Sequence, residues 1–191
     1  MINDKKILAI IPARGGSKRL PGKNMKLLKG RPLLLWSIEA AQDSDLIDDI
    51  VVSTDDRRTL LYAEESGVSS LRRPARFSTD LSLPSEYLRH VLNCYIDYDI
   101  AVILQPTSPL RLSEDIDDAI LFFETSHANS VVSVNEQREH NGAIYVLRRE
   151  CYEEIDTCEE SLQFVMPDSR SFDIDTIEDF ALCEERIDEI L

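Results

Sequence analysis

A short apolar run near the start of the chain, residues 7–11, places the strongest limit on the fold. The run is rich in isoleucine and leads directly into a loop that contains proline and glycine. A strand that is apolar along its whole length is typical of a parallel sheet, because helices cover both faces of such a sheet. We therefore predict a buried parallel strand at this position.

Strand and helix patterns alternate along the rest of the chain. Apolar residues recur at helical spacing over residues 32–43, 57–66, 85–95 and 113–125. Strand-like segments occupy residues 50–54, 100–104, 130–134, 143–147 and 164–166, and Thr176 with Asp179 forms a capping-box pattern before a terminal helix. The alternation predicts an α/β fold with a doubly wound, mostly parallel sheet, whose ligands bind at the carboxyl ends of the strands.

Length and charge limit the domain count and the classes of partner. The chain has 191 residues, 43% of them hydrophobic, with no repeat or linker, so we expect a single domain over residues 1–191. A formal net charge of −15 would repel nucleic acid and anionic membranes, and we expect neither as a partner. The apolar run before Pro12 is too short for a signal sequence or a membrane span, which predicts a cytoplasmic protein.

The loop after the first predicted strand, residues 12–24, is basic and contains glycine. Four of its side chains can neutralise a triphosphate: Arg14, Lys18, Arg19 and Lys23. Its glycines allow backbone N–H groups to approach an anion. A Walker A motif is excluded because Ser17 replaces its first glycine and Asn24 its Ser or Thr, and no G-x-G-x-x-G is present. We predict a phosphate site here, against the alternative of a solvated basic loop.

A second polar loop, residues 105–111, follows the strand predicted at 100–104. It offers amide, hydroxyl and guanidinium groups, and two prolines stiffen it. Fixed donors of this kind suit a sugar or a phosphate, although a rigid turn that starts a helix explains the same residues equally well.

Two aspartates near the C-terminal end, Asp173 and Asp175, form the third candidate element. In an extended segment, residues two apart point the same way, so both carboxylates can reach one hard divalent cation while Ile174 turns into the core. We therefore predict a Mg²⁺ site, although a solvated acidic segment is the alternative in a chain with 36 acidic residues.

Four segments, taken together in this order, resemble the acylneuraminate cytidylyltransferase family: residues 11–24, 104–111, 141–145 and 172–176. The order Arg73-Pro74 followed by Asp80 extends the resemblance. Members of this family make a CMP-sugar and pyrophosphate from CTP and a nonulosonic acid. The resemblance implies a Rossmann-like nucleotidyltransferase fold, CTP and an acidic nine-carbon sugar as substrates, and Mg²⁺ as the cofactor.

The resemblance also implies a role for each matching residue. The implied nucleotide-binding residues are Ala13, Arg14, Gly15, Ser17, Lys23, Asn24 and Arg73. The implied sugar-binding residues are Gln105, Thr107, Ser108 and Arg111, with Gln105 touching the sugar. The implied metal ligands are Asp173 and Asp175, and the implied catalytic residues are Lys23, Arg14, Asp173 and Asp175. Catalysis would then consist of positioning and of neutralising phosphate charge.

One segment departs from the family pattern. Family members usually carry an insertion, between the strand matching residues 131–134 and the segment matching 141–145, that forms a dimer arm and supplies basic residues to the sugar. Only residues 135–140 intervene here, so we expect a monomer or a weak homodimer. Arg138 or His140 could replace a lost sugar contact, or the segment could be a solvated turn. Two other functions stay open: a CTP-binding regulatory or inactive homologue, and a cytidylyltransferase for a related acid such as a 3-deoxy-octulosonate.

Overall fold

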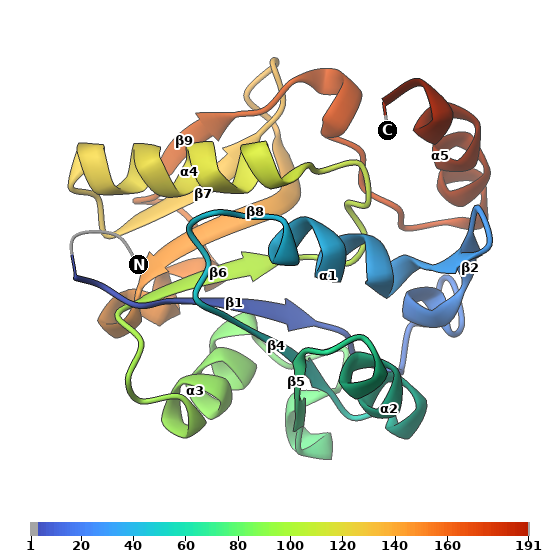
Figure 1. Ribbon diagram of the computed structural model, residues 1–191, viewed down its shortest axis with the longest axis horizontal. Helices are drawn as coiled ribbons and strands as arrows, with labels where there is room; N and C mark the ends of the chain where they lie inside the picture. Colours follow the sequence, from blue (N-terminus) through green and yellow to red (C-terminus); the bar gives the residue numbers. More distant parts are fainter. Residues whose placement is uncertain (1–3, 191) are drawn as a thin grey trace.

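The computed structural model, which describes residues 4–190, is built around a seven-stranded sheet (Figure 1). The strands lie in the order β5-β4-β1-β6-β8-β7-β9. Their bounds are β1 (Ile7–Pro12), β4 (Asp49–Thr54), β5 (Ser69–Arg72), β6 (Ile100–Leu104), β7 (Ser130–Val134), β8 (His140–Arg148) and β9 (Leu162–Val165). β1 pairs in parallel with β4 and with β6, whereas β8 is antiparallel to both of its neighbours. The predicted mostly parallel sheet is therefore confirmed.

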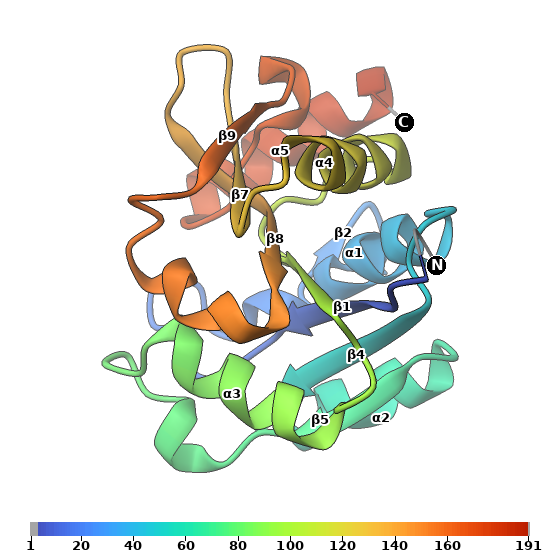
Figure 2. The same ribbon diagram turned by 90° about the vertical axis from the view of Figure 1, so that its left-hand side faces the viewer.

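Helices cover both faces of the sheet. The α-helices are α1 (Leu33–Gln42), α2 (Arg57–Glu65), α3 (Pro84–Cys94), α4 (Ser113–Ser126) and α5 (Ile177–Ile190), of which α5 packs in a separate cluster described below. α1 and α4 lie on one face, and α3 lies on the other with the 3-10 helix η3 (Arg149–Asp156), drawn in orange beside it in Figure 2. The predicted helices are confirmed, with ends that differ by at most one residue. No helix in the described part of the chain is long and apolar enough to cross a membrane.

The two cores explain the apolar run in β1. Ile7, Ala9 and Ile11 point into a core shared with α1 and α4. Leu8 and Ile10 point into the opposite core, which contains the apolar face of α3. Every residue from Ile7 to Ile11 is fully buried, as expected of a central strand covered on both sides.

Several elements were not predicted from the sequence. β5 has the sequence Ser-Ser-Leu-Arg and lies at the sheet edge, where it gains its strand geometry by pairing with β4. A small hairpin, β2 (Leu27–Leu28) with β3 (Arg31–Pro32), precedes α1, and η3 follows β8. These elements carry too few patterned residues for periodicity to reveal them.

A third apolar cluster fastens α5 to the rest of the molecule. Ile174, Phe180 and Ile187 pack there against Leu20 and Leu28 from the N-terminal part of the chain. The predicted capping box is confirmed, because Asp179 accepts the backbone N–H of Thr176 at 2.8 Å and donates its own N–H to the Thr176 hydroxyl at 3.1 Å. The segment around Ile174 is thus anchored on both sides.

The connection between β7 and β8 is a tight turn. Asn135 donates its backbone N–H to the carbonyl of Glu139 at 2.9 Å, and Arg138 adopts a left-handed conformation with φ 67°. Asp168, which follows β9, accepts hydrogen bonds from Glu136 and Gln137 and so ties the turn to the segment after β9. Arg138 and His140 are exposed and do not line the cavities described below.

Candidate functional site

Adjoining cavities lie at the carboxyl ends of β1, β4 and β6. The first cavity, of about 560 Å³, is open to solvent, and most of the residues that line it are polar or charged. It is lined by Pro12, Arg14, Ser17, Lys18, Arg19, Lys23, Asn24, Asp80, Gln105, Pro106, Thr107 and Asp175. The loop after β1, the loop after β6 and the segment before α5 therefore meet at the sheet edge where a doubly wound fold binds its ligands.

Backbone contacts fix the shape of the loop after β1. Asn24 donates its side-chain amide to the carbonyl of Arg14 at 3.0 Å and so closes the loop on itself. The N–H of Gly15 donates to Asp55 at 2.9 Å. A Cβ atom on Gly15 would lie 3.0 Å from the Cβ of Asp56, which makes glycine the residue that fits here. Gly22 adopts φ 67° at the start of the short helix η1 (Lys23–Met25).

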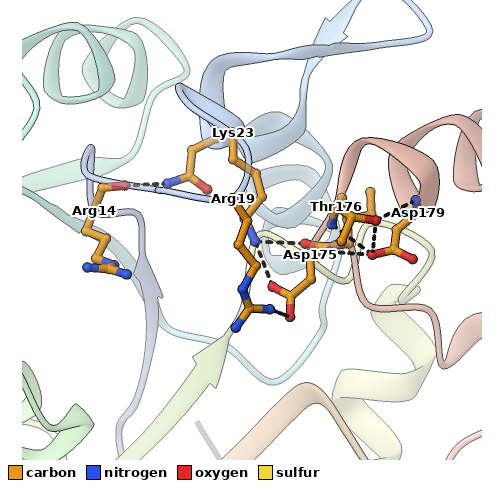
Figure 3. Close-up of polar contacts among 8 residues, drawn as sticks. Arg14, Arg19, Lys23, Asp175, Thr176 and Asp179 are labelled. Carbon is orange, nitrogen blue, oxygen red and sulfur yellow. Dashed lines mark hydrogen bonds and ion pairs between the residues drawn. The ribbon is translucent and has the colours of Figure 1, made fainter. Parts of the chain in front are cut away.

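Carboxylates already pair with the basic side chains of this loop. Arg19 lies 2.5 Å from Asp175, and the Nζ of Lys23 lies 3.3 Å from the same carboxyl group (Figure 3). Arg14 lies on the other side of the loop and pairs with Asp80 at 2.9 Å, while Lys18 contacts the second oxygen of Asp80. A dense basic cluster and two acidic partners thus face one cavity, as expected of a site for a metal-bound polyphosphate.

Ile174, between Asp173 and Asp175, turns into the core as predicted. Ile174 is buried in the third cluster, its N–H donates to the carbonyl of Thr107 at 2.8 Å, and its carbonyl accepts the Nζ of Lys23 at 2.7 Å. Asp175 lines the first cavity, whereas Asp173 does not. The segment therefore joins the loop after β1 to the loop after β6.

The two carboxylates of this segment influence each other electrostatically. Asp173 as a whole is exposed, yet the protein around its carboxyl group raises its pKa by desolvation, and the negative charge of Asp175 acts in the same direction. Among residues 4–190 no group of three or more His, Cys, Asp or Glu side chains could hold a metal ion. Mg²⁺ often binds through one or two carboxylates and substrate phosphates, so Asp175 in the first cavity, with Asp173 close to it in the chain, is the carboxylate pair that could hold such an ion.

Arg73 defines a smaller cavity of about 220 Å³ beside the first. Its guanidinium group lies 4.3 Å from the ring centre of Tyr87 and donates to the carbonyl of Ser53 at 2.9 Å. Burial lowers the pKa of Arg73 and raises that of Tyr87, whose hydroxyl has no hydrogen-bond partner in the described structure. The result is a narrow cavity with a flat cation and a buried hydroxyl, which suits a polar aromatic ring.

Not every residue implied by the resemblance lies at these cavities. Gln105 and Thr107 line the first cavity, but Ser108 and Arg111 do not, and Arg111 is only 2% exposed. Arg111 instead donates to the carbonyl of Ala143 at 2.7 Å and to the hydroxyl of Ser37 at 2.7 Å, and burial lowers its pKa to about 10. The expected sugar contacts of Ser108 and Arg111 are therefore corrected, because buried side chains behind the loop do not reach a ligand in the cavity.

Of the remaining implied residues, Gly15 lines a described cavity and Ala13 does not. Ala13 is buried and donates its N–H to the carbonyl of Ser53, so it shapes the end of β1 without lining a described cavity. Gly15 lines a cavity of about 380 Å³ on the α2 side of the loop. Tyr87 was not predicted as a site residue from the sequence. The sequence placed Asp80 after Arg73-Pro74 but did not predict that it pairs with Arg14 in the first cavity.

Comparisons with known proteins point to one family. A family model described as cytidylyltransferase matches residues 8–165. The chain is 42% identical over 120 residues to an N-acylneuraminate cytidylyltransferase of Escherichia coli, a match that covers 63% of this chain and 29% of that protein. It is 40% identical over 138 residues to a CMP-N,N'-diacetyllegionaminic acid synthase of Legionella pneumophila, covering 68% of this chain and 58% of that protein. The chain thus spans about a third to a little over half of these relatives.

Solved structures show the same fold. CMP:2-keto-3-deoxy-manno-octonic acid synthetase, solved with CTP, superposes with a TM-score of 0.80 at 18% sequence identity. The match covers 97% of this chain and 100% of that one. At this identity the likeness concerns the arrangement of strands and helices.

Proposed function

Because this chain belongs to the cytidylyltransferase family, we propose that it transfers CMP from CTP to a nonulosonic, sialic-type acid and releases pyrophosphate. The observation that carries the proposal is the first cavity, where Arg14, Lys18 and Lys23 face Asp175 at the carboxyl end of the sheet. The named activities of the relatives support the choice of CTP and of an acidic sugar.

The nucleotide would span the two cavities that meet at Arg14. We place the cytosine ring in the smaller cavity beside Arg73, and the phosphates in the first cavity beside the basic loop. The donors Ser17, Lys23 and Asn24 would hold the phosphates and ribose, and Gln105 with Thr107 would face the acceptor sugar from the loop after β6. In this arrangement the α-phosphate lies between the cytosine ring and the basic side chains of the loop after β1.

The reaction forms one bond and breaks another at the α-phosphorus. The anomeric oxygen of the sugar attacks it and loses its proton, and the bond to pyrophosphate breaks on the opposite side. Lys23 and Arg14 would neutralise charge on the phosphate oxygens, and the rigid loop would fix the line of attack. Lys23 suits this role because its bond to the Ile174 carbonyl holds it in place before substrate arrives.

Asp173 and Asp175 would hold Mg²⁺, which supplies additional positive charge to the phosphate oxygens when bound. Their fit rests on Asp175 lining the first cavity and on a neighbouring carboxyl group, Asp173, close enough for the charge of Asp175 to raise its pKa. The tight turn between β7 and β8 leaves no arm for a partner subunit, so a monomer or a weak homodimer belongs to the proposal.

Incubating the chain with CTP, Mg²⁺ and a panel of acids tests the function. The panel contains N-acetylneuraminic, legionaminic and pseudaminic acids and a 3-deoxy-octulosonate, and pyrophosphate release is compared with a control without sugar. Release with one nonulosonic acid supports the proposal, whereas release with the octulosonate alone would reassign the acceptor. Binding of CTP without release for any acid favours the regulatory or inactive homologue, a reading that the short β7–β8 turn also motivates.

A further inference from the structure

The cations assigned above to the triphosphate already have an anionic partner in the protein. One oxygen of Asp80 accepts a hydrogen bond from the Nη1 of Arg14 at 2.9 Å, and the other oxygen pairs with the Nζ of Lys18. Hydrogen bonds from Lys18 and Arg14 lower the pKa of Asp80, so the carboxyl group is ionised at neutral pH. The carboxylate therefore binds the basic loop as a phosphate group would.

Asp80 also lies at the junction between the two cavities. Four residues line both of them: Pro12, Arg14, Asp80 and Gln105. A nucleotide with its ring beside Arg73 and its phosphates beside Lys23 must pass this junction. Its outer phosphates would meet Arg14 and Lys18 while those side chains are bound to Asp80.

The segment that carries Asp80 has its own support. It lies between the short helix η2 (Ala75–Phe77) and α3, and the N–H of Thr79 donates to the hydroxyl of Ser82 at 3.1 Å. Ser82 in turn donates to the carbonyl of Arg76 at 3.0 Å. None of these bonds uses the carboxylate of Asp80, and the adjacent Leu81 is 92% exposed. The carboxylate can therefore be neutralised without dismantling the segment.

We infer that Asp80 is an internal competitor of the polyphosphate: it occupies Arg14 and Lys18 in the free protein and must be displaced when the β- and γ-phosphates bind. The inference rests on the proposed function for its ligand, CTP. By opposing binding of the outer phosphates, Asp80 weakens retention of the pyrophosphate product. CMP lacks the β- and γ-phosphates, so it carries no outer phosphate that competes with Asp80 for Lys18, which lines the first cavity and not the smaller one.

Calorimetric binding measurements test this role with CTP, inorganic tripolyphosphate and CMP as the ligands. Asp80→Asn removes the competing charge, and Asp97→Asn is the matched control because Asp97 is exposed and its loss changes the net charge equally. Two exposed ion pairs are individually weak, so we expect Asp80→Asn to lower the Kd of CTP and of tripolyphosphate by about 3- to 10-fold. The Kd of CMP should change by less than about twofold, and Asp97→Asn should match the wild type.

Other binding results would contradict either the role of Asp80 or the proposed function. An unchanged or higher Kd for tripolyphosphate in Asp80→Asn would overturn the inference, as would equal tightening of all three ligands. If CTP binds no variant while tripolyphosphate still tightens, the proposed function fails and the role of Asp80 stands. Melting curves establish that Asp80→Asn is folded, and Asp80→Ser provides a second variant with the same expected sign.

Discussion

Replacing Lys23 with methionine should destabilise the protein even without any ligand. The side chain of Lys23 is only 13% exposed, and its Nζ donates to the carbonyl of Ile174 at 2.7 Å. A hydrogen bond from a charged group contributes about 1.5–3 kcal/mol, and the longer pair with the part-exposed Asp175 adds less than about 1 kcal/mol. We expect the free energy of unfolding to fall by about 2 kcal/mol, which lowers the melting temperature by about 4–8 °C in a chain of this size.

Thermal melting followed by circular dichroism, without nucleotide or metal, measures this effect. Methionine keeps the apolar stem of the lysine and removes only its charge and its donors. Arg19→Gln is the matched control because Arg19 pairs with the same Asp175 but is 70% exposed and donates to no backbone carbonyl in the described structure. Its melting temperature should fall by less than about 3 °C. The reasoning is refuted if Lys23→Met melts within about 1 °C of the wild type or if both variants fall equally.

Three further predictions concern the carboxylate segment and the assembly. Asp175→Asn should lower turnover by about 100-fold or more, since it removes a proposed Mg²⁺ ligand beside the phosphates. It should shift the melting temperature by less than about 3 °C. Pyrophosphate release and melting curves check both, and normal turnover would remove Asp175 from the site. Asp173→Asn should raise the melting temperature at pH 7 without metal. Desolvation raises the pKa of Asp173 in the folded state, so its ionised carboxyl group destabilises the fold above that pKa. The gain in melting temperature should vanish as the pH falls toward about 4. In sedimentation velocity, the protein should be a monomer or a concentration-dependent dimer, and a tight dimer at low concentration would contradict this.

The sequence predicted those parts of the fold in which local pattern and tertiary packing agree. The run in β1 is apolar at every position because each side chain meets one of two cores. The capping box before α5 formed as expected because both of its residues belong to one turn. By contrast, the strand character of β5 comes from its pairing with β4, which its own four residues do not encode.

The same distinction applies to the candidate site. The motif around Arg111 identified the loop after β6 correctly, but a motif does not state where a side chain points. Its direction is set by the carbonyl of Ala143 in β8, which lies 32 residues further along the chain. The contact between Arg14 and Asp80 joins residues 66 positions apart, and local reasoning on either residue does not reveal it.

The tight turn after β7 is also a position where the chain can be lengthened with little loss of stability. β7 runs in the same direction as β1 and β6, because β8 lies between β6 and β7 and is antiparallel to both. The carboxyl end of β7 and the turn that follows it therefore lie at the same end of the sheet as the first cavity. Lengthening a surface loop is inexpensive, since each doubling costs only about 0.6 kcal/mol of closure entropy. A graft between residues 135 and 139 would add an element at the end of the sheet where the first cavity lies, and would leave the two cores on either side of the sheet unchanged. The turn between β7 and β8 is therefore a natural point for redesigning the acceptor preference of the proposed transferase.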